Sequence, residues 1–315
     1  MHHVNREHVT TVQGATSAAD LYQSLQSAIE LEHSTIPLYL TAGLSVMGAT
    51  SSGMVYVRET LHDIVLEEML HMAAVCNVLN AIGGIPQINK VGFIPQYPGP
   101  LPMVGDFEVH LAPLSNDQLD VFLDIERPEH GGLVFPVRTA AFLAAAPSHF
   151  ATIGEFYEAV MQKITELGDS IFTCDPTRQL ALDGELAAVT NAAQAVAAVQ
   201  LIVKQGEGTD ATPLETPGGK LAHFYHFNEI KVGKKLKPDP NSPKGFSYFP
   251  DDPIAWNASE IINLLPDPKV ANYAIDSPAR TAAGTSTPST AACSTVCRTS
   301  STAIPTTSTQ APCSC

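Results

Sequence analysis

The stretch Glu67-Glu68-Met69-Leu70-His71 decides the fold, because it places polar side chains on an apolar helical face. Residues three apart on a helix lie about 60° from each other, so Glu68 and His71 share one face. Glu67 is turned about 100° away from Glu68. The apolar residues that project within about 40° of Glu68 are Val57, Leu61, Ile64, Met72, Val75 and Leu79. A carboxylate on such a face costs several kcal/mol of desolvation unless it is paired, protonated or bound to a metal.

A second stretch repeats this pattern in Glu30-Leu31-Glu32-His33-Ser34-Thr35-Ile36-Pro37. The apolar stripe of the surrounding helix consists of Tyr22, Leu25, Ile29, Ile36 and Leu40. Glu32 and His33 flank the centre of that stripe, whereas Glu30 sits about 100° off it. We therefore expect Glu32 to be the inward carboxylate. His33 is either a polar neighbour of the same site or a core histidine.

Helical periodicity indicates four long helices and one short one. The expected ranges are roughly 18–48, 54–82, 150–168 and 178–205, with the short helix at 218–231. Gly83 and Gly84 followed by Pro86 end the second helix. Four helices in this order, with a long gap between the second and third, predict a mainly α fold. We expect an antiparallel four-helix bundle with one long crossover.

The crossover is the segment 85–149, which is rich in proline and glycine. Within this irregular insertion we expect one strand at 107–111 and a short helix at 116–123. Long excursions inside compact domains often form lids or walls of functional sites. Residues 1–275 are expected to form one domain. Residues 276–315 are rich in Ser, Thr and Pro and are expected to form a disordered tail.

The third and fourth long helices offer further acidic candidates. Glu158 fits the apolar stripe of the third helix better than Glu155, although neither lies well on it. In the fourth helix, the stripe Val189, Val196 and Val203 extends four residues to Glu207. The helix then breaks at glycines and resumes near His223, with His226 as the rival histidine. Glu207 and His223 are therefore expected to act as a discontinuous Glu/His pair.

The composition narrows the classes of function. The chain has 315 residues, with 32 Asp and Glu against 17 Lys and Arg, and a formal net charge of −15. Such a chain is a poor match for a nucleic-acid binder or for a protein held on anionic lipid. No uninterrupted apolar stretch reaches about 18 residues, and no secretory signal is visible at the start. We therefore expect a cytoplasmic protein with no nucleic-acid partner and no membrane span.

The inward candidates together make a metal-ligand set. The set is Glu32, Glu68, His71, Glu158, Glu207 and His223. Carboxylates and two imidazoles inside a four-helix bundle are typical of carboxylate-bridged di-iron or di-manganese sites. We therefore expect two iron ions as cofactors, with manganese as the alternative metal.

At these residues the chain resembles the ferritin-like superfamily, and within it the branch of the iminophenyl-pyruvate dimer synthase type. The stretches that carry the resemblance are Ala28–Pro37, Glu67–Met72, Ala81–Gly84, Ile153–Tyr157, Gln205–Gly208 and His223–Tyr225. The resemblance covers roughly 20–231 and implies a ferritin-like bundle with a di-iron centre. The chain departs from ordinary ferritin-like proteins in its insertion 85–149 and in its interrupted fourth helix.

The leading hypothesis is a non-haem di-iron oxidoreductase that activates O2 to oxidise a small organic molecule, with secondary metabolism as a setting. Its partners would be that substrate, O2 and an electron donor, and the protein would be a monomer or a small homo-oligomer. The metal centre itself, rather than a separate catalytic side chain, would carry the reaction. The alternative is a metal-binding or iron-handling protein without catalytic turnover.

Overall fold

The computed structural model describes residues 4–105, 107–128, 150–182, 184–208, 212–215 and 219–286. The chain divides into two compact units, Met1–Asp267 and Pro268–Cys315. The first unit is mainly helical and contains every predicted metal ligand.

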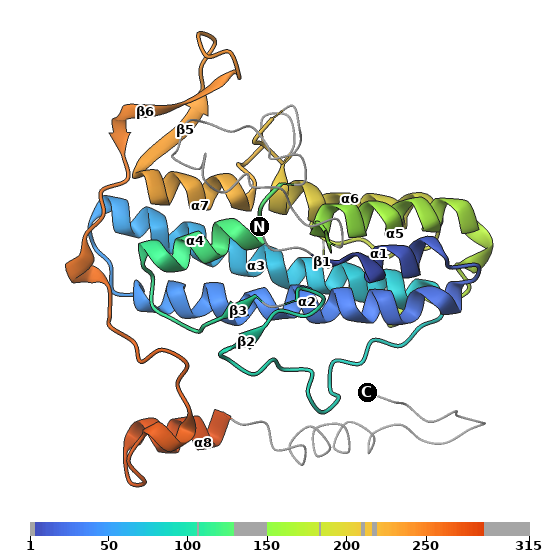
Figure 1. Ribbon diagram of the computed structural model, residues 1–315, viewed down its shortest axis with the longest axis horizontal. Coiled ribbons are helices and arrows are strands. Elements are labelled where there is room, and N and C mark those ends of the chain that lie inside the picture. The colour runs from blue at the N-terminus through green and yellow to red at the C-terminus, as the bar shows by residue number, and fades with distance from the viewer. Residues whose placement is uncertain are drawn as a thin grey trace. The chain divides into compact units, whose positions relative to one another are not determined.

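Two long helices form the continuous half of the first unit. These helices, α2 (Ala18–Ser45) and α3 (Ser52–Ala81), are joined by a short connection and pack side by side (Figure 1). At the start of α2, the carboxylate of Asp20 accepts hydrogen bonds from the backbone N–H groups of Thr16 and Ser17. After α3, Gly83 adopts φ +91°, a conformation that favours glycine and ends the helix where the sequence predicted.

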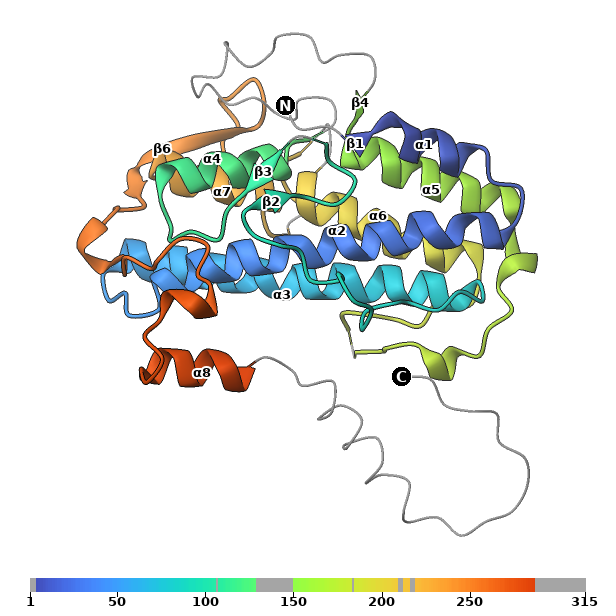
Figure 2. The same cartoon turned by 60° about the horizontal axis from the view of Figure 1, so that its bottom comes forward.

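Each of the other two positions in the bundle is filled by two shorter helices in line. One position holds α4 (Asn116–Ile125) and α5 (Ile153–Leu167), and the other holds α6 (Ala192–Glu207) and α7 (His223–Val232). Figures 1 and 2 show α4 beside α7 at one end and α5 beside α6 at the other, and the packing agrees. Both composite helices are therefore interrupted at the same level, against the middle of α2 and α3.

Aromatic side chains pack tightly on one side of these interruptions. The rings of Tyr39, Phe122 and Phe227 come from α2, α4 and α7, and their centroids lie 4.7 to 5.1 Å apart. All three side chains are completely buried. Rings at these separations contribute about 0.5–1.5 kcal/mol per pair beyond the area that they bury. This cluster fixes α4 and α7 against α2 and so fixes the helix ends that reach the centre of the bundle.

Small elements complete the first unit. They are α1 (Arg6–Gln13), β1 (Val4–Asn5), β2 (Gly99–Pro100), β3 (Glu108–Val109), β4 (Phe150–Ala151), β5 (Lys234–Pro238), β6 (Phe246–Pro253), and the 3-10 helices η1 (Asp169–Ile171), η2 (Pro176–Arg178) and η3 (Ala258–Glu260). The strands pair antiparallel as β1 with β4, β2 with β3, and β5 with β6.

The main difference from the sequence prediction is the start of the fourth helix. We expected it at 178, but α6 begins at Ala192. The side chain of Asn191 accepts a hydrogen bond from the backbone N–H of Gln194 and so caps the helix there. Gly184, with φ +80°, interrupts the apolar segment that precedes it. Helix α1 and the hairpin β5–β6 were not predicted.

The insertion and the tail are partly outside the described residues. Between the second and third predicted helices, 129–149 are not described, whereas 116–125 form α4 close to the predicted 116–123. The second unit contains η4 (Val270–Asn272) and α8 (Pro278–Ser286). Helix α8 falls within the segment expected to be disordered from 276, and 287–315 lie outside the described residues.

One helix of the described chain, α3, is long and apolar enough to cross a membrane by length and composition. Its most apolar window is 56% buried inside the unit. The same helix supplies inward polar residues to the middle of the bundle. These are the properties of a core helix in a bundle.

The start of α3 is held by a residue far along the chain. The Glu260 carboxylate accepts hydrogen bonds from the backbone N–H groups of Thr50 (3.2 Å) and Ser51 (3.1 Å) and from the Ser51 hydroxyl (2.8 Å). A negative charge at a helix N-terminus is favourable because it complements the helix dipole. These hydrogen bonds, with that of the Ser51 side chain foremost, lower the pKa of Glu260 below its usual value.

We predict that Glu260→Gln lowers the melting temperature at pH 7 and that the difference shrinks as the pH falls toward 3. A carboxyl with a lowered pKa in the folded state stabilises above its unfolded pKa, and this contribution is lost on protonation. Thermal unfolding of both proteins over this pH range measures the effect. Glu59→Gln is the control, because Glu59 is a mostly exposed carboxylate on α3 whose ion pair with Arg58 is 3.6 Å long. A difference that does not change with pH would contradict the charge argument.

Candidate metal centre

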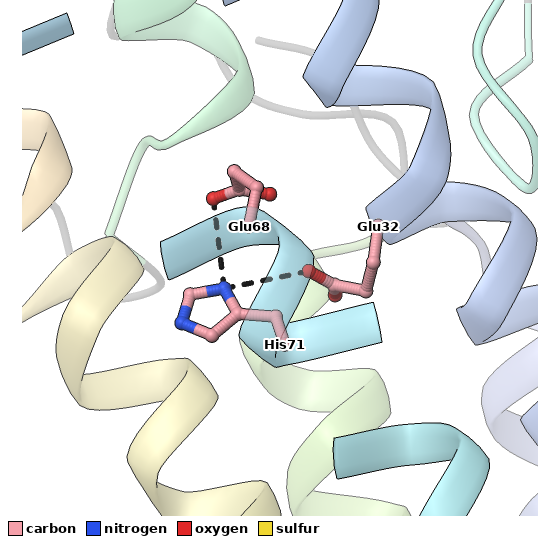
Figure 3. Close-up of side chains that lie close together, drawn as sticks. All are labelled: Glu32, Glu68 and His71. Carbon is pink, nitrogen blue, oxygen red and sulfur yellow. Dashed lines mark ion pairs between the residues drawn. The ribbon is translucent and has the colours of Figure 1, made fainter. Parts of the chain in front are cut away.

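The first part of the centre comes from α2 and α3. Glu32, Glu68 and His71 are all buried, and His71 Nδ1 lies 3.5 Å from both Glu32 Oε2 and Glu68 Oε1. Figure 3 shows the imidazole pointing between the two carboxylates, with its Nδ1 toward both. The three side chains offer ligand atoms close enough together to hold one metal ion. We call them the first group.

The second part comes from the two helix interruptions. Glu126, which caps the end of α4, and His223, the first residue of α7, are both buried. His223 Nδ1 lies 3.0 Å from Glu68 Oε1 and 3.8 Å from Glu126 Oε2. Glu68, Glu126 and His223 therefore form a second group that can hold a metal ion. The two groups share Glu68, whose Oε1 faces both imidazoles.

In each of the three carboxylates, one oxygen lies beside a hydroxyl group and the other faces a histidine. Tyr157 donates to Glu32 Oε1, and Tyr39 donates to Glu126 Oε1. The Thr35 hydroxyl lies 2.6 Å from Glu68 Oε2. In each carboxylate the other oxygen faces a histidine. Three hydroxyls on α2 and α5 thus orient three carboxylates toward a common centre.

The two histidines are oriented from outside the centre. His71 Nε2 lies 2.9 Å from Gln205 Oε1, and His223 Nε2 lies 2.9 Å from Glu67 Oε2. Because both partners are acceptors, each Nε2 carries the proton and donates it. In a neutral imidazole this leaves the Nδ1 lone pair pointing inward, as a metal ligand requires. Nδ1 of the fully buried His223 makes no hydrogen bond.

The electrostatics of the centre favour added positive charge. Burial by itself lowers the pKa of His71, but Glu32 and Glu68 outweigh it and raise the value to about 10. The pKa of His223 is likewise raised against the effect of burial by Glu126, Glu67 and Glu68. Burial raises the pKa of Glu32. The buried carboxylates therefore favour positive charge beside them, whether it comes from a proton on a histidine or from another cation.

The centre encloses a small cavity of ≈ 40 Å³. That volume is enough for a few atoms or water molecules, since one water needs roughly 10–15 Å³ on this measure. Its apolar wall consists of Leu31, Ile125, Ile153, Ile202 and Val203. Polar ligands inside an apolar wall are the usual arrangement of a buried metal site.

Comparison with known proteins identifies the family. A family model described as ferritin-like matches residues 25–232. The chain belongs to the ferritin-like family. A solved ferritin-like protein from Caulobacter vibrioides is 25% identical, with 71% of this chain and 78% of that chain covered and a TM-score of 0.47. The comparison with curated proteins gave no match.

Six residues of the present chain were predicted from its sequence as metal ligands, and four of them lie together in the two groups. They are Glu32, Glu68, His71 and His223. Glu207 is half-buried and lines the small cavity outside both groups. The rival His226 instead contacts the Tyr56 hydroxyl and Glu229, at 3.2 Å and 3.6 Å. His33 packs its ring against Phe93.

Glu158 is the predicted residue that the structure does not bring to the centre. It is exposed on α5, and its neighbour Tyr157 is the α5 side chain that reaches Glu32. A shift of one residue rotates a side chain by about 100° around the helix, which separates the two positions. Glu155 is not at the centre either, because its carboxylate caps α5 by accepting from the backbone N–H of Thr152.

The candidate ligand that sequence reasoning missed is Glu126. It lies in the crossover insertion, where no metal ligand was expected. The signal was present, because Leu119, Phe122, Leu123 and Glu126 follow the spacing of one apolar helical face. Gly206 on α6 makes room for it, since a Cβ at that position would lie 3.0 Å from Glu126 Oε2.

We predict that His223→Ala destabilises the metal-free protein by about 3–5 kcal/mol, because it removes the cation from a buried group of carboxylates. His226→Ala is the matched control one turn along α7, and it leaves both groups intact. Urea unfolding in the presence of a chelator measures both variants. Equal losses for the two variants would contradict a special electrostatic role for His223.

Proposed function

We propose that this chain holds two metal ions, one in each group with Glu68 between them, and uses them to activate O2. The product would be an oxidised small organic molecule, so the chain would be a non-haem di-iron oxidoreductase. The observation that carries the proposal is that the two oxygens of each carboxylate have different partners. One oxygen is held by a hydroxyl and the other faces an imidazole Nδ1.

The residues present fit a pair of metal ions. Three carboxylates and two imidazoles are hard and borderline ligands that suit iron or manganese. The buried Nδ1 of His223 has no hydrogen-bond partner and points into the second group. The raised pKa values of both histidines reflect carboxylates that need positive charge. Iron is proposed first, with manganese as the alternative metal.

When bound, two iron ions would supply the electrons with which O2 is reduced. The residues of the chain hold and orient everything around that step. Tyr39, Thr35 and Tyr157 fix the outer carboxylate oxygens, and Gln205 and Glu67 fix the two imidazole rings. Burial, with a neighbouring carboxylate, raises the pKa of Tyr157 and keeps its proton on the hydroxyl beside Glu32.

The remaining expectations belong to the same proposal. An electron donor is needed to restore the reduced metals after each turnover. The protein would act in the cytoplasm, as a monomer or a small homo-oligomer, without a nucleic-acid or membrane partner. The resemblance of its motifs to the iminophenyl-pyruvate dimer synthase branch is compatible with a role in secondary metabolism.

We predict that Glu126→Ala lowers the iron content of anaerobically loaded protein from about two ions to about one per chain, since the second group loses a ligand. Glu158→Ala is the matched control, because Glu158 is an exposed glutamate on α5 outside both groups. Metal analysis after desalting measures both variants. If Glu158→Ala lost metal and Glu126→Ala did not, the proposed ligand set would be wrong.

O2 uptake by the same iron-loaded protein distinguishes an enzyme from an iron-handling protein. We predict that O2 uptake with excess reductant continues well beyond one O2 per pair of irons, and that Glu68→Ala abolishes it. Size-exclusion chromatography is expected to give a monomer or a small oligomer. Uptake that stops after one O2 would support metal handling without turnover, and a very large shell would support storage.

A further inference from the structure

A second and much larger cavity lies beside the candidate metal centre. Its volume is ≈ 600 Å³, in the range of pockets that hold small organic ligands. It lies between α3 and α6 and is lined on another side by residues 184–189. We call it the lateral cavity. His71 and Ile202 line both this cavity and the small cavity of the centre, so one layer of side chains separates them.

Small side chains on two packed helices create this space. Ala74 on α3 and Ala197 and Ala198 on α6 line the lateral cavity. Leu66 and Leu201 also line it, and they remain 46% and 38% exposed. Large apolar side chains left open around a hollow indicate a surface that another molecule covers. The alanine-rich sequence of α6 therefore leaves room for a ligand.

The charged lining of the lateral cavity is acidic. Asp63, Glu67 and Glu185 contribute three carboxylates, against two basic side chains, Lys220 and His71. Lys220 Nζ already lies 3.2 Å from Glu67 Oε1 and 3.4 Å from Asp63 Oδ2. An anionic ligand would compete with these carboxylates for Lys220, whereas a cation meets an excess of negative charge.

The lateral cavity also reaches a residue that orients the centre. Gln205 lines it, and Gln205 Oε1 accepts the hydrogen bond from His71 Nε2. A ligand that packs against Gln205 therefore contacts the side chain that orients the imidazole of His71. This places the ligand close to the candidate metal centre and outside its small cavity.

We propose that the lateral cavity binds the organic substrate and that this substrate has an apolar body and a protonated amine. The inference rests on the proposed function, because it assigns the substrate site of the same centre. The apolar body packs against Leu70, Ala198 and Leu201. The ammonium group lies toward Asp63 and Glu185.

The test compares two probes with the same ring and opposite charges, 2-phenylethylamine and 3-phenylpropionate. Calorimetry on the metal-loaded protein is expected to show the amine bound at least about tenfold more tightly than the carboxylate. Ala198→Phe fills the cavity and is expected to weaken amine binding by about tenfold or more. Ala193→Phe is the control, because Ala193 is exposed on the same helix and does not line the cavity.

A second variant removes charge without adding bulk. Glu185→Gln, at an exposed position, is expected to weaken amine binding and to strengthen carboxylate binding while the circular dichroism spectrum stays unchanged. Equal or tighter binding of 3-phenylpropionate to the unaltered protein would overturn the substrate class. Undiminished amine binding by a folded Ala198→Phe variant would overturn the location.

Metal analysis of the same samples separates this inference from the proposed function. A full metal load without amine binding would overturn the inference alone. Amine binding that Ala198→Phe abolishes, in protein that holds no metal, would overturn the proposed function alone.

Discussion

The shared carboxylate of Glu68 is the constraint on which the bundle depends. Its Oε1 faces His71 and His223, and its Oε2 lies beside Thr35, so residues of three helices meet at one side chain. A buried charge is stable only when such partners are fixed by well-packed surroundings. The two long helices provide a continuous support, and the two composite helices bring their ends to the same level (Figure 1). The interruptions therefore serve the centre, because helix ends bring Glu126 and His223 to it.

The buried charges of the centre cost the fold stability. Apolar residues of similar size would stabilise the bundle as well as this cluster of charges or better, since buried ion pairs rarely repay their desolvation. The neighbouring carboxylates raise the pKa of both histidines above the ordinary value, which favours the charged imidazolium form. A metal ion that binds the folded arrangement of ligands more tightly than the unfolded chain would stabilise the fold, so metal binding and folding would be coupled.

The sequence predicted four of the five residues that form the two groups, and three of these four lie on long, regular helices. Glu32, Glu68 and His71 were found because each helix carries enough apolar residues to define a face. Glu126 was not found, because α4 offers only a few turns within a proline-rich insertion. Glu158 was preferred because charge was sought on α5, where the structure uses the hydroxyl of Tyr157. The start of α6 was misplaced, since apolar periodicity continues through residues that precede the helix cap at Asn191.

The composite helices also affect how the two groups assemble during folding. All three candidate ligands of the first group come from the hairpin of α2 and α3 and lie within 40 residues of one another in the sequence. The side chains that orient two of them, Tyr157 and Gln205, come later in the chain. The second group joins α3 to the ends of α4 and α7, across loops of much greater length. Contacts between distant residues form more slowly because more chain entropy is lost in closing the loop. The two candidate metal positions are therefore unequal in origin: one takes all its candidate ligands from a local hairpin, and the other takes them from helices that meet only when the entire bundle closes.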